Sequence, residues 1–366
     1  MKSQFLETFE KIISLENLLE AWKEFERGKK NRKDVQEFSL NLMDNIFALH
    51  RDLTHHTYKH GGYQAFKVND PKPRDIHKAS VRDRLLHHAI HRILYPFFEK
   101  TFIADSYSCR LGKGTHRAIN RFRAFAWKVS RNNTQTCWIL KCDIRKFFAN
   151  IDHEILLSIL REYIPDENIV WLLENVIGSF TSPQPSPLHT GGQAYKGEGG
   201  ENIGLPLGNL TSQLFVNIYM NEFDQFAKHK LKAKHYIRYS DDFVIFSESK
   251  EWLENAIYPI KIFLKEKLRL DLHPGKIYLK TLASGMDFLG WVNFFDHRVL
   301  RTKTKRRMLR NIEQKRFLLR EELISEETFS QSLQSYLGIL KHCRGYKIAE
   351  KIEEIGHGCF LEENHL

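Results

Sequence analysis

The chain has 366 residues, 42% of them hydrophobic and 12% aromatic, which suffices for two or three packed subdomains around a sizeable core. It carries 56 Lys and Arg against 45 Asp and Glu, a formal net charge of +11, so the expected partner is a polyanion, nucleic acid before an acidic membrane surface. We expect neither a signal peptide nor a membrane span, because no apolar run is long enough. Five cysteines without a C-x-x-C pair argue against a disulfide framework, and we expect a reduced, cytoplasmic protein.

Apolar periodicity predicts the following elements. In chain order they are helices at 3–25 and 35–53, a strand at 64–68, a helix at 81–98, a strand at 140–144 and helices at 153–163 and 214–226. His87 and His91 lie four residues apart on one of these helices, but no acid or cysteine at matching spacing completes a zinc set. Residues 181–202, rich in proline and glycine, are expected to form a mobile loop inside one domain.

The segment 301–320 is strongly basic. It holds nine Lys and Arg against one Glu, with apolar residues at roughly helical spacing. A solvated helix face is the ordinary explanation for such a run. The strength of the bias favours contact with phosphates instead.

Two adjacent carboxylates, Asp241 and Asp242, lie where two apolar runs meet, in the order Tyr236 to Arg238, Tyr239-Ser240-Asp241-Asp242, and Phe243 to Phe246. This pattern predicts a β-hairpin with acids at its turn. Such a turn presents charge on a rigid support, which suits divalent-metal chemistry, although Asp-Asp in a turn is often only turn chemistry.

A further acid, Asp143, ends the apolar segment Trp138 to Cys142 and precedes Phe147 and Phe148. Placed opposite the hairpin, it could complete three carboxylates around two magnesium ions, which activate an attacking hydroxyl and stabilise a departing phosphate. The alternative is that Asp143 merely caps a helix.

Between the acidic segments lies a glycine-containing run, Ile203-Gly204-Leu205-Pro206-Leu207-Gly208-Asn209-Leu210-Thr211-Ser212-Gln213. Its glycines allow backbone to approach a flat or anionic ligand closely. In this order the three segments resemble the palm of a reverse transcriptase. The resemblance extends over about residues 60–300. Four further segments resemble other motifs of that family: Pro71-Lys72-Pro73-Arg74 with Val81-Arg82-Asp83-Arg84, Ser106 to Gly114, Leu272 to Lys276, and Phe288-Leu289-Gly290.

The resemblance implies an α+β, right-hand polymerase fold with fingers, a palm built on an antiparallel sheet, and a short helical thumb. We expect a helical N-terminal extension at 1–59, fingers at 60–135, the palm at 136–295 with the insertion 181–202, and a basic helical thumb at 296–366.

The resemblance also assigns catalytic groups. Asp143 and Asp241 would hold two Mg²⁺ ions, which Mn²⁺ could replace, with Asp242 as a weaker third carboxylate and the carbonyl of Ile144 as a further ligand. Lys276 is a candidate proton donor to the departing diphosphate, and a surface ion pair is its alternative role.

Substrate contacts follow from the same resemblance. Phe148 matches the steric gate that excludes a ribose 2′-hydroxyl, and Tyr239 would pack near the primer end, with a core position as its alternative. Arg110, with Lys72 or Arg74, would clamp the triphosphate through bidentate contacts. The remaining substrate-binding residues are expected to be Leu207, Gly208 and Gln213.

Two positions narrow the subfamily. Group II intron and retroviral enzymes usually carry glutamine in place of Leu207, and Ser-Pro in place of Ser212-Gln213. The run Leu-Gly-Asn-Leu-Thr-Ser-Gln resembles the enzymes of diversity-generating retroelements, which copy a template RNA with frequent errors at adenines. Because a missing amide removes a discriminating contact, Leu207 should loosen base selection.

Three functions remain as hypotheses. The first is an error-prone, RNA-directed DNA polymerase that extends a DNA or RNA primer with dNTPs. Its partners would be a template or noncoding RNA and a small basic accessory protein or second protein of the same system, without a membrane. The second is an antiviral-defence reverse transcriptase that works with a noncoding RNA. The third, a non-catalytic RNA-binding or maturation scaffold, is disfavoured by the intact acids.

Overall fold

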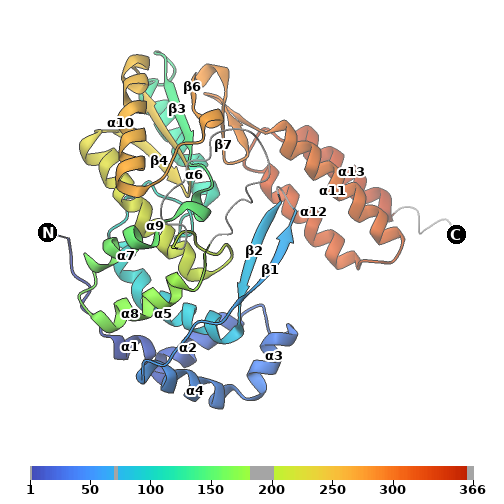
Figure 1. Ribbon diagram of the computed structural model, residues 1–366. Coiled ribbons are helices and arrows are strands. Elements are labelled where there is room, and N and C mark those ends of the chain that lie inside the picture. Colours follow the sequence, from blue (N-terminus) through green and yellow to red (C-terminus); the bar gives the residue numbers. More distant parts are fainter. Residues whose placement is uncertain (1, 70–72, 182–201, 361–366) are drawn as a thin grey trace, which may run out of the picture.

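The computed structural model describes residues 2–69, 73–181 and 202–360, with side chains to residue 356, and shows a mixed α and β fold (Figure 1). Its helices are α1 Phe9–Ile13, α2 Leu15–Glu26, α3 Lys33–Leu40, α4 Leu42–Thr54, α5 Val81–Glu99, α6 Thr115–Val129, α7 His153–Arg161, α8 Glu167–Gly178, α9 Leu210–Gln225, α10 Lys250–Leu268, α11 Thr302–Arg320, α12 Glu326–Leu340 and α13 Tyr346–Phe360. Its strands are β1 Tyr63–Val68, β2 Arg74–Ala79, β3 Trp138–Asp143, β4 His235–Tyr239, β5 Asp242–Ser247, β6 Tyr278–Thr281, β7 Met286–Phe288, β8 Trp291–Asn293 and β9 Arg298–Leu300.

The predicted element types are confirmed from β1 to α9, with small shifts of their ends. The single helices expected at 3–25 and 35–53 are wrong, because each is divided in two. Ser14 leaves the helical conformation and accepts a hydrogen bond from the backbone N–H of Asn17, which starts α2 as a new helix. Asn41 similarly separates α3 from α4. The predicted loop 181–202 lies outside the described residues, apart from residues 181 and 202.

A four-stranded antiparallel sheet in the order β4-β5-β3-β6 forms the centre of the molecule. Strands β3, β4 and β5 are largely buried, whereas the edge strand β6 alternates between exposed and half-buried residues. Along β5, Phe243 and Ile245 belong to one hydrophobic core and Val244 and Phe246 to another. Successive side chains of a strand point to opposite faces, so this alternation packs helices α9 and α10 on one face and α6 on the other.

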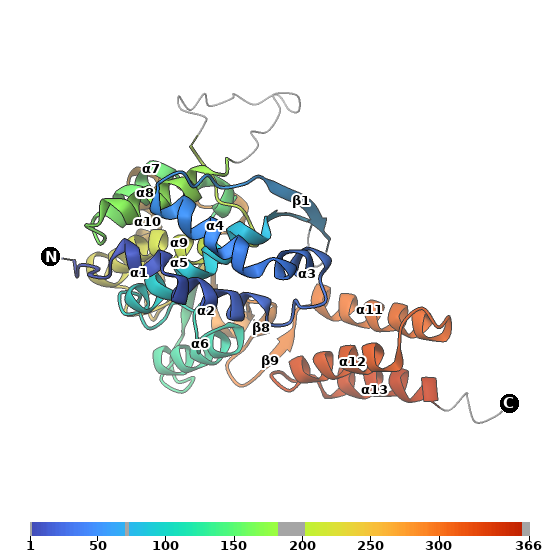
Figure 2. The same ribbon diagram turned by 90° about the horizontal axis from the view of Figure 1, so that it is seen from below.

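The remaining elements extend from this centre. Helices α1 to α4 pack around α5 in the first core, whereas the β1–β2 hairpin projects from it (Figure 1). A three-stranded antiparallel sheet, β7-β8-β9, leads into α11, α12 and α13, which lie side by side as a separate bundle (Figure 2). The helix predicted for the basic segment 301–320 is therefore confirmed as α11. No helix in the described part of the chain is long and apolar enough to cross a bilayer.

Candidate active site

The predicted hairpin with acids at its turn is confirmed. Strands β4 and β5 are antiparallel, and Tyr239 pairs with Asp242 across a two-residue turn made of Ser240 and Asp241. Ser240 has φ of 59°, a positive value that the tight turns of two-residue hairpins require at their first central position. The turn therefore holds Asp241 at its tip and Asp242 at the first position of β5.

Asp143 joins these acids through strand pairing. Strand β3 runs antiparallel to β5, and Asp143 lies directly opposite Asp242 in the register. One residue further on, the backbone N–H of Ile144 donates to the carbonyl oxygen of Asp241 over 3.1 Å. Three carboxylates from two distant segments consequently meet at one end of the central sheet.

The electrostatics of these carboxylates are unfavourable without a cation. Burial and the charge of Asp143 raise the pKa of Asp241. Burial, with the charges of Asp241 and Asp143, raises the pKa of Asp242 to about 7 against the opposing effect of Lys141. Carboxylates that are both buried and mutually repelling mark places where a bound cation would relieve strain.

Two lysines form ion pairs with two of the three carboxylates. The Nζ of Lys276 lies 2.7 Å from Oδ1 of Asp143, and the Nζ of Lys141 lies 3.2 Å from Oδ2 of Asp242. Lys141 also donates to the carbonyl of Asp287 over 2.9 Å. The sequence analysis missed Lys141, although a lysine inside a fully buried strand is a signal that it needs a local acid.

The donor set suits a hard cation, but its side chains do not yet converge on one point. The Oδ1 atom of Asp242 is buried and has no hydrogen-bond partner among the described residues. Within residues 2–69, 73–181 and 202–360, no three His, Cys, Asp or Glu side chains form a group that could hold a metal as they stand. Carboxylate oxygens are the ligands that Mg²⁺ prefers, which favours a metal role here. Because the side chains do not converge, the metal role of Asp143, Asp241, Asp242 and Ile144 stays a prediction.

The segment Leu272 to Lys276 reaches the acids along the edge of β3. Its His273 N–H donates to the carbonyl of Asp143 over 2.8 Å, and Leu272 bridges to Ile144. Pro274–Lys276 then forms a short 3-10 turn that directs Lys276 towards Asp143. Backbone pairing thus positions the candidate proton donor next to a catalytic candidate.

Phe148 follows Asp143 within the 3-10 helix Phe147–Asn150. Its carbonyl accepts a hydrogen bond of 2.8 Å from the N–H of Leu205. The ring is half-buried and packs edge-on against Phe147 at 5.6 Å between ring centroids. The structure therefore places Phe148 beside the glycine-containing run, and its function as a steric gate stays a prediction.

The glycine-containing run packs on β2. His77 N–H donates to the carbonyl of Leu207 over 3.0 Å, and the side-chain amide of Asn209 donates to the carbonyl of His77 over 2.9 Å. Gly208 has φ of 104°, and a Cβ atom there would lie 2.9 Å from a methyl group of Ile76. Glycine is thus required at this position for both conformation and space.

Two other expected substrate residues lie in this region of the fold. The hydroxyl of Tyr239 accepts a hydrogen bond of 3.2 Å from the hydroxyl of Thr115, at the start of α6. Gln213 lies in the first turn of α9 and is half-buried. Their contacts with substrate stay predictions.

Of the three expected triphosphate ligands, Arg110 is already occupied. It donates to both carboxylate oxygens of Glu99, over 2.9 and 2.7 Å, and to the carbonyls of Ile103 and Ser106. Its side chain is only 4% exposed and is held by these contacts, and its contact with a triphosphate stays a prediction. Lys72 lies outside the described residues, whereas Arg74 is close enough to lower the pKa of Asp241.

A basic cavity of about 640 Å³ contains Arg74 and lies between α6, the β7–β8 turn and α11. The β7–β8 turn contributes Leu289 and Gly290, the expected primer grip. Helix α11 and the residue before it contribute Arg301, Lys303 and Arg307. The basic segment singled out in the sequence therefore faces the same cavity as Arg74.

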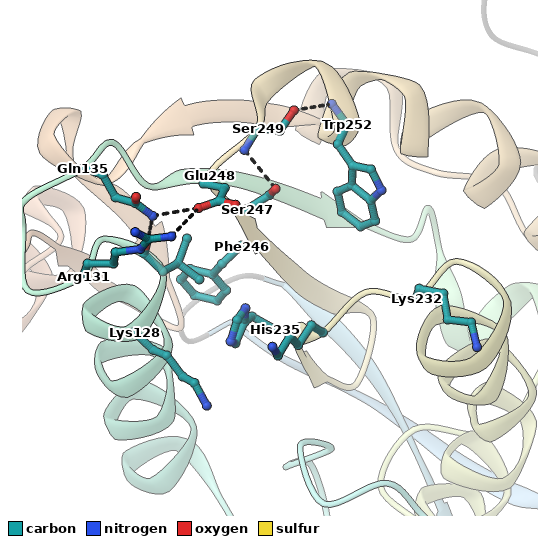
Figure 3. A pocket seen from close by; sticks show the side chains of 12 residues that line it. Lys128, Arg131, Gln135, Lys232, His235, Phe246, Ser247, Glu248, Ser249 and Trp252 are labelled. Atoms are coloured by element: carbon teal, nitrogen blue, oxygen red, sulfur yellow. Dashed lines mark hydrogen bonds and ion pairs between the residues drawn. The ribbon is translucent and has the colours of Figure 1, made fainter.

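A second basic cavity, of about 590 Å³, lies at the other end of β5 (Figure 3). Figure 3 shows Arg131 and Gln135 converging on Glu248, while Lys128 of α6 and Lys232 of the turn before β4 point away from it. None of the expected site residues lines this cavity. It is therefore separate from the acids.

Comparison with known proteins gives the family. The family model "Reverse transcriptase (RNA-dependent DNA polymerase)" matches residues 66–293, a range that contains the three carboxylates and Lys276.

Three curated relatives agree with this match at low identity. The chain is 24% identical over 266 residues to protein YkfC of Escherichia coli, covering 64% of this chain and 65% of that protein. It is 22% identical over 337 residues to the group II intron-encoded protein LtrA of Lactococcus lactis, covering 74% and 52%. It is 20% identical over 287 residues to a putative COX1/OXI3 intron 2 protein of Saccharomyces cerevisiae, covering 63% and 30%. The chain thus spans less than two thirds of the length of each of these relatives. Because the family model matches more than half of the chain, the protein belongs to the reverse transcriptase (RNA-dependent DNA polymerase) family.

Proposed function

We propose that the protein is an RNA-directed DNA polymerase that extends a DNA or RNA primer on an RNA template with dNTPs. The observation that carries this proposal is the meeting of Asp143, Asp241 and Asp242 at one end of the sheet. Burial, together with the negative charges of neighbouring carboxylates, raises the pKa values of Asp241 and Asp242, which fits a site that functions with bound cations. The family match supports the same reaction.

The metal in this proposal is Mg²⁺, with Mn²⁺ as a substitute. Asp143 and Asp241 would hold the ions, with Asp242 and the carbonyl of Ile144 as further ligands. A pair of such ions, when bound, supplies Lewis-acid activation of the attacking hydroxyl and charge stabilisation of the departing diphosphate. The buried, unpartnered Oδ1 of Asp242 supports the fit, since a cation would satisfy it.

The chain's own residues would do the remaining chemistry. Lys276 would transfer a proton to the departing diphosphate, since its amine already lies at the carboxylate of Asp143. Arg74, in the basic cavity, would hold the triphosphate, because Arg110 is engaged by Glu99. Phe148 would exclude ribonucleotides through the bulk of its ring.

We further propose that the fold is that of a right-hand polymerase, which the placement of the central sheet, the β1–β2 hairpin and the bundle of α11 to α13 supports. The central sheet would be the palm, the β1–β2 hairpin part of the fingers, and α11 to α13 the thumb (Figure 1). Template and primer would follow the cavity between α6, the β7–β8 turn and α11, whose lining includes Lys303, Arg307 and Arg301, the last paired with Asp287.

The biological setting in this proposal is a diversity-generating retroelement. Leu207, in place of glutamine, supports it, because a leucine offers no hydrogen bond for discriminating the nascent pair. A structured noncoding RNA would be the partner, with a small basic protein as a second one. Sequencing the RNA that copurifies with the protein tests this setting: paired template and variable repeats support diversification, and a noncoding RNA without such repeats points to antiviral defence.

Primer extension on poly(rA)/oligo(dT) with Mg²⁺ tests the polymerase itself. We expect incorporation by the unaltered chain and its loss in Asp241→Asn. The matched control is Asp44→Asn, which makes the same change at an exposed acid of α4. No incorporation above the Asp241→Asn background would leave the scaffold hypothesis as the better one.

A further inference from the structure

Arg298, the first residue of β9, is a buried arginine for which the described residues supply no anionic partner. Its exposed fraction is 8%, and its Nη1 atom has no hydrogen-bond partner among the described residues. Burial and the neighbouring Arg123 lower its pKa, whereas no acid is among the groups that raise it. Buried charges in proteins are normally paired, because the desolvation of an unpaired charge is costly. A guanidinium in this position therefore requires an anion.

Arg298 lines a cavity of about 390 Å³ at the junction of three segments. The lining residues of α6 include Arg123, and those of the turn between α12 and α13 include Lys341 and Arg344. The acid in this lining is Asp296, which lies 2.6 Å from Nδ1 of His297. Four cationic side chains thus line a space that contains one carboxylate, Asp296, which pairs with His297 and also lies 4.0 Å from Nη1 of Arg344.

Backbone contacts hold this junction in place. The N–H of Arg344 donates to the carbonyl of Arg298 over 2.8 Å, which ties the α12–α13 turn to β9. On the other side, the indole N–H of Trp127 donates to the carbonyl of Phe295 over 2.9 Å, which ties α6 to the β8–β9 turn. The backbone segments around the cavity are therefore tied together, while the side chains of Arg123, Lys341 and Arg344 are exposed around the buried Arg298.

The cavity adjoins the cavity that contains Arg74 but shares no lining residue with it. A stacked histidine pair, His116 of α6 and His342 after α12, has ring centroids 3.8 Å apart. His116 lines the larger cavity that contains Arg74, and His342 lines the cavity of Arg298. The family match ends at residue 293, so Arg298, Lys341 and Arg344 lie beyond it.

We propose that this cavity is a phosphate-binding site, in which Arg298, Arg123, Lys341 and Arg344 bind the oxygens of a phosphate group. Phosphate matches the geometry of guanidinium groups, which donate in bidentate pairs, and its charge removes the repulsion among the four cations. The phosphate could be free, as inorganic phosphate or diphosphate, or part of an RNA backbone. The site stands independently of the polymerase activity, because none of its residues belongs to the proposed catalytic set.

A bound phosphate would bridge α6, the β8–β9 turn and the α12–α13 turn. Any ligand that binds the folded state alone stabilises it, by an amount that rises with the logarithm of its concentration once that exceeds the dissociation constant. We therefore expect phosphate to raise the melting temperature of the full chain progressively with its concentration, by on the order of a few degrees, above the effect of chloride at equal ionic strength.

The variants for this test are Arg298→Gln and, since a buried substitution can impair folding, Arg123→Gln on the exposed side of α6. Each should weaken phosphate binding by about tenfold or more, measured by isothermal titration calorimetry with inorganic phosphate. The matched control is Lys128→Gln, which removes one positive charge from the same helix but lines the separate cavity of Figure 3. It should leave phosphate affinity unchanged.

Parallel titrations distinguish the sources of the phosphate. Saturation by diphosphate or inorganic phosphate, with no tighter binding of a short single-stranded RNA, identifies a free ligand. RNA binding that is tighter than that of free phosphate, and that weakens in Arg123→Gln but not in Lys128→Gln, identifies a backbone phosphate. The proposal is overturned if phosphate, diphosphate and RNA give no saturable effect beyond chloride. It is equally overturned if Arg123→Gln and Lys128→Gln bind all three as the unaltered chain does.

Discussion

The amine of Lys276 lies 2.7 Å from a carboxylate oxygen of Asp143, across two segments that only the β3 edge brings together. In this position the amine of Lys276 compensates the negative charge of Asp143 when no metal ion is bound. It would remain close to the reacting phosphate when metal ions bind. The contact gives the candidate proton donor a defined position relative to the candidate metal ligands.

Lys276→Ala should lower the maximal rate of primer extension by about 10²-fold or more, because general acid catalysis contributes that much. The KM for dNTP should change little, and Lys276→Arg, which keeps the charge but donates its proton less readily, should restore little activity. Single-nucleotide extension over a pH series measures this. Lys280→Ala on neighbouring β6 is the control. A rate unchanged in Lys276→Ala would assign the lysine to a simple ion pair.

Leu207→Gln should lower misincorporation opposite template adenine, since the new amide can hydrogen-bond near the nascent pair and penalise a mismatch. The backbone of Leu207 is already fixed by its hydrogen bond to His77, so the change acts through the side chain. Sequencing of products from an adenine-containing RNA measures the error spectrum. Leu207→Met, which keeps an apolar side chain, should retain the original errors, and equal spectra for both variants would refute the assignment.

Asp224→Asn should destabilise the fold strongly. Arg238 and Asp224 are both fully buried, and Nη2 of Arg238 lies 2.7 Å from Oδ2 of Asp224 beneath the acidic hairpin. Removing one partner leaves an uncompensated buried charge, at a cost of about 3–5 kcal/mol in the free energy of unfolding. Urea denaturation measures it. Glu174→Gln, which breaks the exposed pair with Arg161, should cost less than about 1 kcal/mol. Similar losses in both variants would contradict the argument.

Acid should destabilise the protein partly through α5. Burial lowers the pKa of His91 to about 4, from an ordinary value of 6.5. Between these values the unfolded chain binds more protons than the folded one, so stability is complete above pH 6.5 and falls as the pH drops towards 4, by at most about 1.4 kcal/mol per pH unit for one histidine. Urea midpoints across this range should vary less in His91→Gln than in the unaltered chain. Exposed His55→Gln is the control, and an equal slope in His91→Gln would count against this origin.

Template–primer binding should weaken as salt rises, and Lys303→Gln should reduce the slope of log affinity against log salt by about 1, because one phosphate contact is lost. Lys303 lines the cavity between α6, the β7–β8 turn and α11. Fluorescence anisotropy with a labelled hybrid duplex measures the slope. Lys23→Gln on α2 should leave it unaltered, and the same slope for Lys303→Gln would exclude this contact.

The local sequence was sufficient for the acidic hairpin, for Asp143 at the end of β3 and for the basic helix α11, because strand alternation, turn chemistry and helical spacing are properties of neighbouring residues. The helix breaks at Ser14 and Asn41 could not be predicted from the local sequence, because the apolar face continues across them. Only the tertiary structure decided that Glu99 engages Arg110, that Lys141 pairs with Asp242, and that Arg298 is buried with no anion from the described residues beside it. Each of these depends on which distant side chains become neighbours in a low-dielectric interior, where a charge must find a partner, and spacing along the chain does not encode that partner.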